Sequence, residues 1–133
     1  MPHFLKRSAA ILMLTLLGVA AAQADTPEQM LAGYSAQAGV PASPQRGQQF
    51  FNRNHGQSWQ CASCHGVLPT QAGQHAATAK PIQPLAPAFN PARFSDAAKV
   101  EKWFGRNCKD VLARACTPSE KADVLSWLLT LKP

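Results

Sequence analysis

The sequence has few of the β-branched residues that fill sheets. After residue 24, valine and isoleucine occur only at Val40, Val67, Ile82, Val100, Val111 and Val124. No segment alternates polar and apolar residues, which argues against strands. Charged residues are also scarce, at 15% of 133 residues against 46% hydrophobic, so the chain is not a charged disordered tail. The length and composition predict one helical domain.

The basic residues form no dense run. Lysine and arginine number 13 against 7 acidic residues, which gives a formal net charge of +6. Without a run of basic residues, the excess does not indicate nucleic-acid binding. It is better matched to a bound anionic group or to an acidic protein partner.

The first 24 residues have the three parts of a secretory signal peptide. Lys6 and Arg7 precede an uncharged apolar stretch at residues 9–22, and Ala22-Gln23-Ala24 is a small-residue cleavage signal. The apolar stretch is short for a membrane anchor of about 20 residues. We therefore expect cleavage after residue 24, a domain at 25–133 without a membrane span, and a periplasmic location of the Gram-negative type.

Helix-start signals recur along the predicted domain. Thr26-Pro27-Glu28-Gln29 and Thr117-Pro118-Ser119-Glu120 are capping boxes with proline at the first helical position. Ser43-Pro44 and Ser95-Asp96 open two more helices. The predicted helices cover residues 27–37, 44–54, 96–106 and 118–131.

Residues 66–90 carry no helical pattern, and prolines at 69, 81, 84, 87 and 91 interrupt this region. An irregular segment of this length needs something to pack against, and the chain's own side chains look insufficient. A buried prosthetic group would resolve the difficulty.

The sequence Cys61-Ala62-Ser63-Cys64-His65 has the C-x-x-C-H pattern that attaches c-type haem. Two thiols one helical turn apart add to the two vinyl groups as thioethers, and the adjacent histidine coordinates the iron. Attachment takes place outside the cytoplasm, in agreement with the signal peptide. We expect Cys61 and Cys64 to hold one haem c per chain, with His65 as an iron ligand.

Three other uses of these cysteines carry less weight. A thioredoxin-like site needs a βαβ context, which is missing from the pattern. A zinc site built from the four cysteines or His65 needs thiolates, which an oxidising compartment disfavours. A Cys61–Cys64 disulfide would leave the irregular segment unexplained.

The second axial ligand is not the usual methionine, because no methionine follows His65. Met30 lies in the first predicted helix, where packing against Leu31 or Tyr34 is its expected role. The remaining candidates are His55, His75, Asn107, a lysine or an open site. His55 is too close to Cys61 in sequence to reach the opposite haem face easily.

Several ordered motifs resemble the sphaeroides haem protein family of monohaem c-type cytochromes. They are Trp103-Phe104-Gly105-Arg106-Asn107-Cys108, Thr117-Pro118-Ser119-Glu120-Lys121-Ala122-Asp123, Lys80-Pro81-Ile82-Gln83-Pro84-Leu85-Ala86-Pro87 and Asn90-Pro91-Ala92-Arg93-Phe94, together with the C-x-x-C-H motif. The match runs from about Ser43 to Leu131. It implies an all-α, cytochrome c-like domain wrapped around one covalent haem, with a long proline-rich loop.

The resemblance also implies specific roles. Asn107 would be the second iron ligand, beside a Cys108–Cys116 disulfide, and it would leave the iron on reduction and admit oxygen or nitric oxide. A dihaem cytochrome is the typical electron donor, with a membrane cytochrome as another redox partner. In an oxidising compartment the two remaining cysteines would form a disulfide that closes a short loop. Such a bridge would raise the free energy of unfolding by about 2.5 kcal/mol.

Other haem contacts are expected from residue type. We expect one of Trp103 and Phe104 to line the haem pocket and the other to fill the core. Arg93, Arg106 and Lys80 are candidates to neutralise the haem propionates.

Two functions fit these features: one-electron transfer, and binding of a small diatomic ligand at a labile sixth position. The missing methionine favours a labile site that serves both. The alternative is a plain six-coordinate carrier with a histidine ligand and no gas chemistry. An enzyme is not indicated, because no acid/base pair can be assigned, although the sequence leaves oxygen reduction open.

Overall fold

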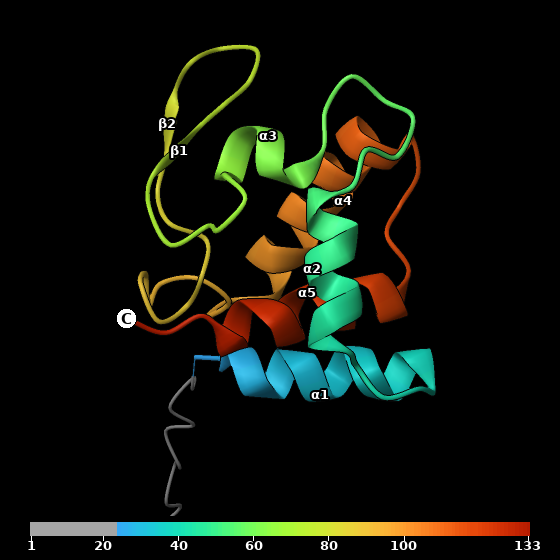
Figure 1. The fold of residues 1–133 in the computed structure, drawn as a ribbon. Coiled ribbons are helices and arrows are strands. Elements are labelled where there is room, and N and C mark those ends of the chain that lie inside the picture. Colours follow the sequence, from blue (N-terminus) through green and yellow to red (C-terminus); the bar gives the residue numbers. More distant parts are fainter. Residues whose placement is uncertain (1–23) are drawn as a thin grey trace, which may run out of the picture.

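The computed structural model describes residues 24–133 as a helical fold with one very small sheet (Figure 1). The helices and strands are α1 (Pro27–Ala38), α2 (Pro44–Asn52), α3 (Cys61–His65), β1 (Gly73–Gln74), β2 (Pro81–Ile82), α4 (Ala97–Leu112) and α5 (Pro118–Thr130). The predicted signal peptide lies outside the described residues, apart from residue 24. In the part of the chain that is described, no helix is long and apolar enough to cross a membrane.

The predicted helix starts are confirmed by their caps. Thr26 and Thr117 each accept from the backbone N–H three residues on, and Gln29 and Glu120 complete the two capping boxes. Ser43 and Asp96 cap α2 and α4 through their side chains. Each cap satisfies an N–H group that the helix itself leaves without a partner.

Helix α5 is the centre of the hydrophobic core. Seven consecutive residues, 122–128, are buried, and Leu125 and Leu128 have no exposed surface. Figure 1 shows α1 across one end of the molecule, with α5 lying across the molecule next to it and α2 rising from that end. Phe51 of α2 lies against Trp127 of α5, with ring centroids 5.0 Å apart. Phe51 is thus the buried aromatic residue through which α2 packs on α5.

Helix α4 continues six residues beyond its predicted end at residue 106. Cys108 and Val111 are buried and extend the apolar stripe of Val100 and Phe104, so packing favours further helix. The helix ends at Ala113, which has a left-handed backbone and donates its N–H to Lys109. Asn107 is therefore an internal helical residue and not a helix-terminal one.

The irregular segment contains a short sheet that the sequence did not predict. Strands β1 and β2 form an antiparallel pair in which Gly73 lies opposite Ile82. The segment is then folded back by the buried Pro69, whose carbonyl oxygen accepts from the N–H groups of Leu85 and Ala86. The expectation of an irregular proline-rich loop holds for the rest of it.

Helices α2 and α5 approach each other closely at Gly47. A Cβ atom there would lie 1.9 Å from the carbonyl oxygen of Asp123. Gly47→Ala must therefore push the helices apart, and we expect it to lower the free energy of unfolding by at least about 3 kcal/mol. Gly33→Ala in α1 is the control, because nothing lies within 4 Å of its added Cβ. The free energy of unfolding of that variant should rise by about 0.5–1 kcal/mol, because alanine favours a helix interior over glycine. Urea unfolding followed by circular dichroism measures both; equal stability of the two variants would contradict the close approach.

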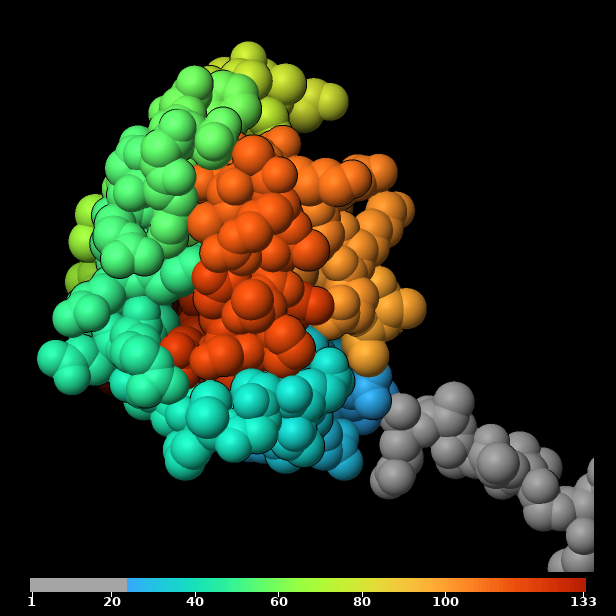
Figure 2. Space-filling model, turned by 90° about the vertical axis from the view of Figure 1, so that its right-hand side faces the viewer, coloured from blue at the N-terminus to red at the C-terminus, as the bar shows by residue number. Residues whose placement is uncertain are grey.

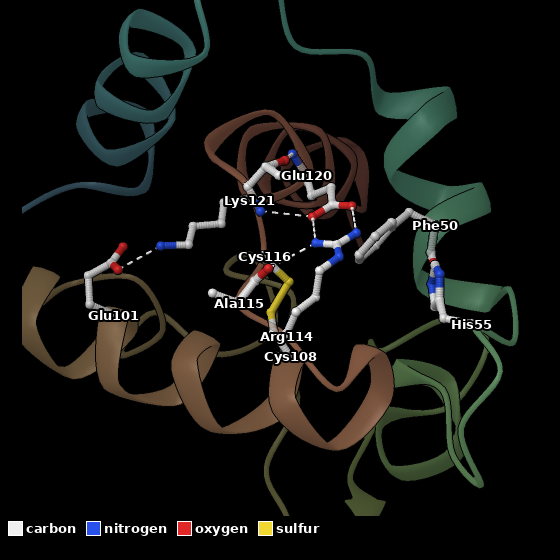
Figure 3. Close-up of a disulfide and its surroundings, with 10 residues drawn as sticks. Phe50, His55, Glu101, Cys108, Arg114, Ala115, Cys116, Glu120 and Lys121 are labelled. Carbon is white, nitrogen blue, oxygen red and sulfur yellow. Dashed lines mark hydrogen bonds and ion pairs between the residues drawn. A yellow bond between two sulfur atoms is a disulfide. The ribbon is translucent and has the colours of Figure 1, made fainter.

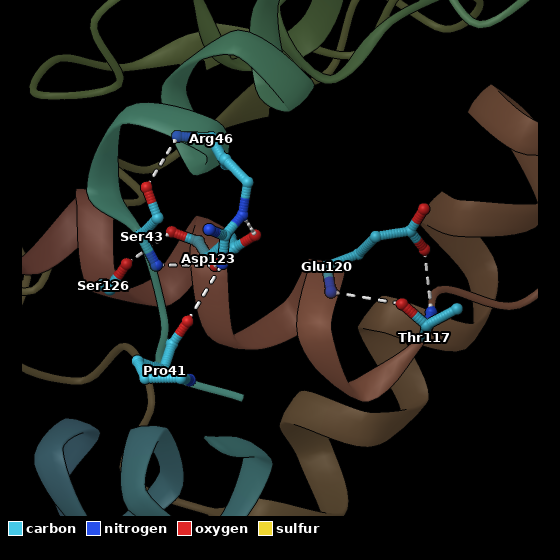
Figure 4. A network of polar contacts seen from close by, with 7 residues as sticks. All are labelled: Pro41, Ser43, Arg46, Thr117, Glu120, Asp123 and Ser126. Atoms are coloured by element: carbon cyan, nitrogen blue, oxygen red, sulfur yellow. Dashed lines mark hydrogen bonds and ion pairs between the residues drawn. The ribbon is translucent and has the colours of Figure 1, made fainter. Parts of the chain in front are cut away.

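A buried acidic residue fastens the same two helices. Asp123 accepts from the backbone N–H of Ser43 at 2.6 Å and from Arg46 through Nε and Nη2 (Figure 4). Arg46 also donates to the carbonyl oxygen of Pro41. The carboxylate therefore ties the loop before α2 and the helix itself to α5, next to the close approach at Gly47.

Candidate haem-attachment site

The one-turn helix α3 places the predicted attachment residues together. Neither Cys61 nor Cys64 is in a disulfide, and both are partly buried. Burial raises the pKa of Cys61 to about 11, so that side chain is a protonated thiol at neutral pH. Two unpaired thiols one helical turn apart fit thioether formation with two vinyl groups.

His65 closes α3 and is held as a neutral imidazole. Burial, and secondarily the positive charge of Arg93, lower the pKa of His65 to about 4. Its ring lies 6.0 Å from that of Phe51, which belongs to the core. A neutral imidazole backed by a rigid core is the form in which histidine binds iron.

The loop after α3 crosses close to the attachment helix. A Cβ atom on Gly73 would lie 2.0 Å from the carbonyl oxygen of Cys64. The backbone N–H of Ala76 donates to the sulfur of Cys64 at 3.3 Å. Only glycine permits this approach, so the irregular segment is fitted to the attachment motif.

Arg93 secures the far end of the same loop. Its Nε donates to the carbonyl oxygen of Pro84 at 2.9 Å and its Nη2 to that of Gln83 at 2.7 Å. Its burial lowers its pKa. The structure thus gives Arg93 a backbone-bracing role, and its predicted contact with a haem propionate stays a prediction.

Asn107 lies on α4 immediately before Cys108, and its side chain is exposed. Cys108 and Cys116 form a disulfide with a Cα–Cα distance of 5.6 Å (Figure 3). The bridge ties the last turn and a half of α4 to the start of α5. Beyond it, Arg114 and Glu120 form a bidentate ion pair.

The two aromatic residues before Asn107 behave differently. Phe104 packs against the core and meets Tyr34 edge to face at 6.0 Å. Trp103 is 46% exposed, with the guanidinium of Arg106 above its ring at 5.6 Å. Of the pair, Phe104 fills the core, which leaves Trp103 as the candidate to line a haem pocket.

The other histidines already have partners. His55 Nε2 lies 2.8 Å from the carbonyl oxygen of Phe50, and the two rings contact each other at a tilt of 48°. His75 Nδ1 accepts from the N–H groups of Ala77 and Thr78. These two contacts tie the His75 ring to its own loop. These contacts disfavour a bis-histidine site.

Sequence reasoning missed a network that braces α4. Glu101 accepts from the Tyr34 hydroxyl and from the Lys121 ammonium, both at 2.6 Å. Lys121 also lies over the rings of Tyr34 and Phe104. The network joins α1, α4 and α5 nearly two turns before Asn107. A signal was present in the sequence, because Glu101 falls next to the apolar stripe of α4.

The charge of Glu101 predicts a pH dependence. Burial opposes its ionisation, but hydrogen bonds from Lys121 and Tyr34 outweigh burial and lower its pKa below the usual 4.5. Its stabilising effect is therefore complete above about pH 4.5 and is lost as the pH falls through the lower folded value. Glu101→Gln should be less stable than wild type at neutral pH, and the difference should shrink near pH 3 in urea unfolding.

Glu28→Gln is the control for this pH effect. Glu28 lies in the exposed first turn of α1. Its replacement should change stability by less than about 0.5 kcal/mol. A deficit in Glu101→Gln that stayed constant with pH would show that lost packing, and not lost charge, was responsible.

The described residues do not support a zinc site. Cys108 and Cys116 are bonded to each other, and nowhere between residues 24 and 133 do three His, Cys, Asp or Glu side chains gather as metal ligands. The donor set that remains on α3, two thiols and a neutral imidazole, fits haem c.

Comparison with known proteins agrees with this donor set. Residues 37–128 match a family described as a domain of unknown function, DUF1924. Over 122 residues the chain is 49% identical to the cytochrome c-type protein SHP of Cereibacter sphaeroides, covering 89% of this chain and 94% of that protein. The chain belongs to the sphaeroides haem protein family of monohaem c-type cytochromes.

Two solved structures resemble this chain closely. One is oxidized SHP, described as an oxygen-binding cytochrome c. It is 50% identical to this chain with a TM-score of 0.75, and the match covers 80% of this chain and 99% of that one. The other is the solution structure of cytochrome c'' from Methylophilus methylotrophus, described as giving insights into haem-ligand detachment. It is 37% identical to this chain with a TM-score of 0.69, and the match covers 80% of this chain and 94% of that one.

Membership in the sphaeroides haem protein family confirms the predicted fold class and the predicted cofactor. The protein carries one covalently bound haem c. Which residues hold the haem and its iron stays a prediction, with Cys61, Cys64, His65 and Asn107 as the assigned positions.

Proposed function

We propose that this protein is a periplasmic one-electron carrier whose sixth iron ligand is labile. His65 would hold the iron permanently, and Asn107 would hold it only in the oxidised state. Reduction would then open the site to a diatomic ligand such as oxygen or nitric oxide. The bound haem supplies the one-electron couple and the position for that ligand. The observation that carries the proposal is the placement of Asn107 in a braced helix beside the disulfide.

The ligand chemistry gives Asn107 its lability. A neutral amide oxygen is a weak, hard donor that binds ferric iron better than ferrous iron. Reduction therefore weakens the bond without any large movement of the chain. The disulfide and the Glu101 network hold the backbone on both sides of Asn107, so the same side chain can return on oxidation.

The relatives support the coarse features of this reading. SHP is described as binding oxygen, and work on cytochrome c'' concerns detachment of a haem ligand. We propose an electron-carrying and ligand-binding role and not an enzymatic one. A dihaem cytochrome or a membrane cytochrome is the proposed redox partner. The runner-up is a six-coordinate carrier with His75, which the hydrogen bonds to its Nδ1 disfavour.

Asn107→Ala tests the assignment. The variant should keep its covalent haem, and its ferric absorption spectrum should change to that of an open or water-ligated site. Asp110→Ala is the matched control, because Asp110 is exposed and lies one turn further along α4. Its spectrum should stay like that of wild type. A wild-type ferric spectrum in Asn107→Ala would remove Asn107 from the iron.

A further inference from the structure

Four basic side chains form a line on the outer face of α4. Lys99, Lys102, Arg106 and Lys109 follow one another at intervals of three and four residues, which places them on one side of a helix. All four are exposed, and none forms an ion pair with another described residue. Acidic side chains lie only near its two ends: Asp96 accepts from the backbone N–H of Lys99, Asp25 accepts from that of Ala97, and Asp110 follows Lys109. We call these four residues the basic face.

The basic face lies opposite the face that packs on the core. Phe104, Cys108 and Val111 point inward, so the basic face points away from the molecule. Figure 2 shows the residues near 100, in orange, along one flank of the molecule beside α5. Around the helix, Trp103 falls between the basic face and Asn107. Arg106 connects the two regions, because its guanidinium lies over the Trp103 ring.

We propose that the basic face is the docking surface for an acidic redox protein that delivers the electron. The inference rests on the proposed electron-transfer function and names the chemistry of its partner. In the docked pair the partner is oxidised by one electron and this cytochrome is reduced by one.

Charge complementarity selects this occupant. The chain is positive overall, and a line of like charges attracts an acidic surface at long range. The same helix carries Asn107, the proposed iron ligand. Docking on this helix would therefore bring the partner close to the iron that is to be reduced. The other exposed basic residues, such as Arg53, Lys80 and Lys132, lie on separate segments and form no comparable line.

The test is the rate at which the mature holoprotein is reduced by a reduced plant-type two-iron ferredoxin, a small acidic redox protein. In stopped-flow measurements the wild-type rate constant should fall at least about tenfold when ionic strength rises from about 10 to about 300 mM. Lys99→Glu/Lys102→Glu should lower the rate constant about tenfold or more at low ionic strength. Glutamates near the start of α4 suit the helix dipole, so this variant should fold normally.

Arg53→Glu/Lys132→Glu is the matched control. It changes the net charge by the same amount at exposed sites away from α4. Its rate constant should change less than about threefold. Equal losses in both variants would show an effect of total charge and would overturn the proposal, as would a wild-type rate in Lys99→Glu/Lys102→Glu.

Two further measurements separate the alternatives. Dithionite should reduce every variant fully; a haem that cannot be reduced and reoxidised would refute the proposed function and not the docking surface alone. Sedimentation with vesicles of anionic phospholipid tests a membrane partner. Vesicle binding that is lost in Lys99→Glu/Lys102→Glu while the ferredoxin rate stays at the wild-type value would overturn the acidic-protein proposal.

Discussion

Replacing Cys61 and Cys64 together with alanine should leave almost no covalently attached haem. Both thiols lie on one turn of α3 and neither is in a disulfide, so both are available to add to a vinyl group. Without the thioethers, only the bond from His65 and apolar contacts would hold haem. We expect no haem to remain on the chain in a denaturing gel stained for haem peroxidase activity. Each single variant should keep one thioether, visible as a shifted pyridine haemochrome band.

Cys108→Ala/Cys116→Ala is the control for this prediction. It removes the same number of cysteines, but these two form the disulfide between α4 and α5. This variant should retain covalent haem and lose about 2.5 kcal/mol of stability. If it lost its haem as completely as the first variant, attachment would depend on folding of the whole chain and not on the α3 thiols.

Asn107→His should convert the labile site into a permanently six-coordinate one. Imidazole binds both ferric and ferrous iron strongly, unlike a neutral amide oxygen. If the new ligand occupies the iron in about 99% of ferrous molecules, the apparent affinity for carbon monoxide falls about 100-fold. Titration of the reduced variant with the gas measures this change.

The matched control is Asp110→His, which places the same side chain one turn further along α4. It should keep the carbon monoxide affinity of wild type. Unchanged affinity in Asn107→His would mean that position 107 does not face the iron. Reduced affinity in both variants would mean that an added histidine acts through something other than direct ligation.

Local rules were sufficient to predict most of the helices. Each predicted start carried a capping residue, and a cap depends only on neighbours within one turn, as at Thr26 and Thr117. The end of α4 was missed because no proline or glycine marks it. Packing of Cys108 and Val111 carries the helix onward, and packing depends on residues far away in the sequence.

The candidate site likewise has a part that neighbouring residues predict and a part that only the folded chain brings together. The C-x-x-C-H motif is contiguous, so the attachment residues could be predicted from five neighbouring residues, although the helix α3 that they form was not predicted. Glu101, Tyr34 and Lys121 come from three helices, and only the folded chain brings them together. The close approach of Gly73 to Cys64 likewise joins the loop to α3, and nothing in the local sequence around Gly73 indicates it.

The central claim, a sixth ligand that leaves on reduction, is tested most directly by absorption spectra of the mature protein. They are recorded oxidised, then reduced, then reduced under carbon monoxide. The account predicts a six-coordinate oxidised spectrum, a change of coordination on reduction and a large further shift with the gas. A sharp six-coordinate reduced spectrum that carbon monoxide leaves unchanged would contradict it and indicate a strong second ligand such as His75.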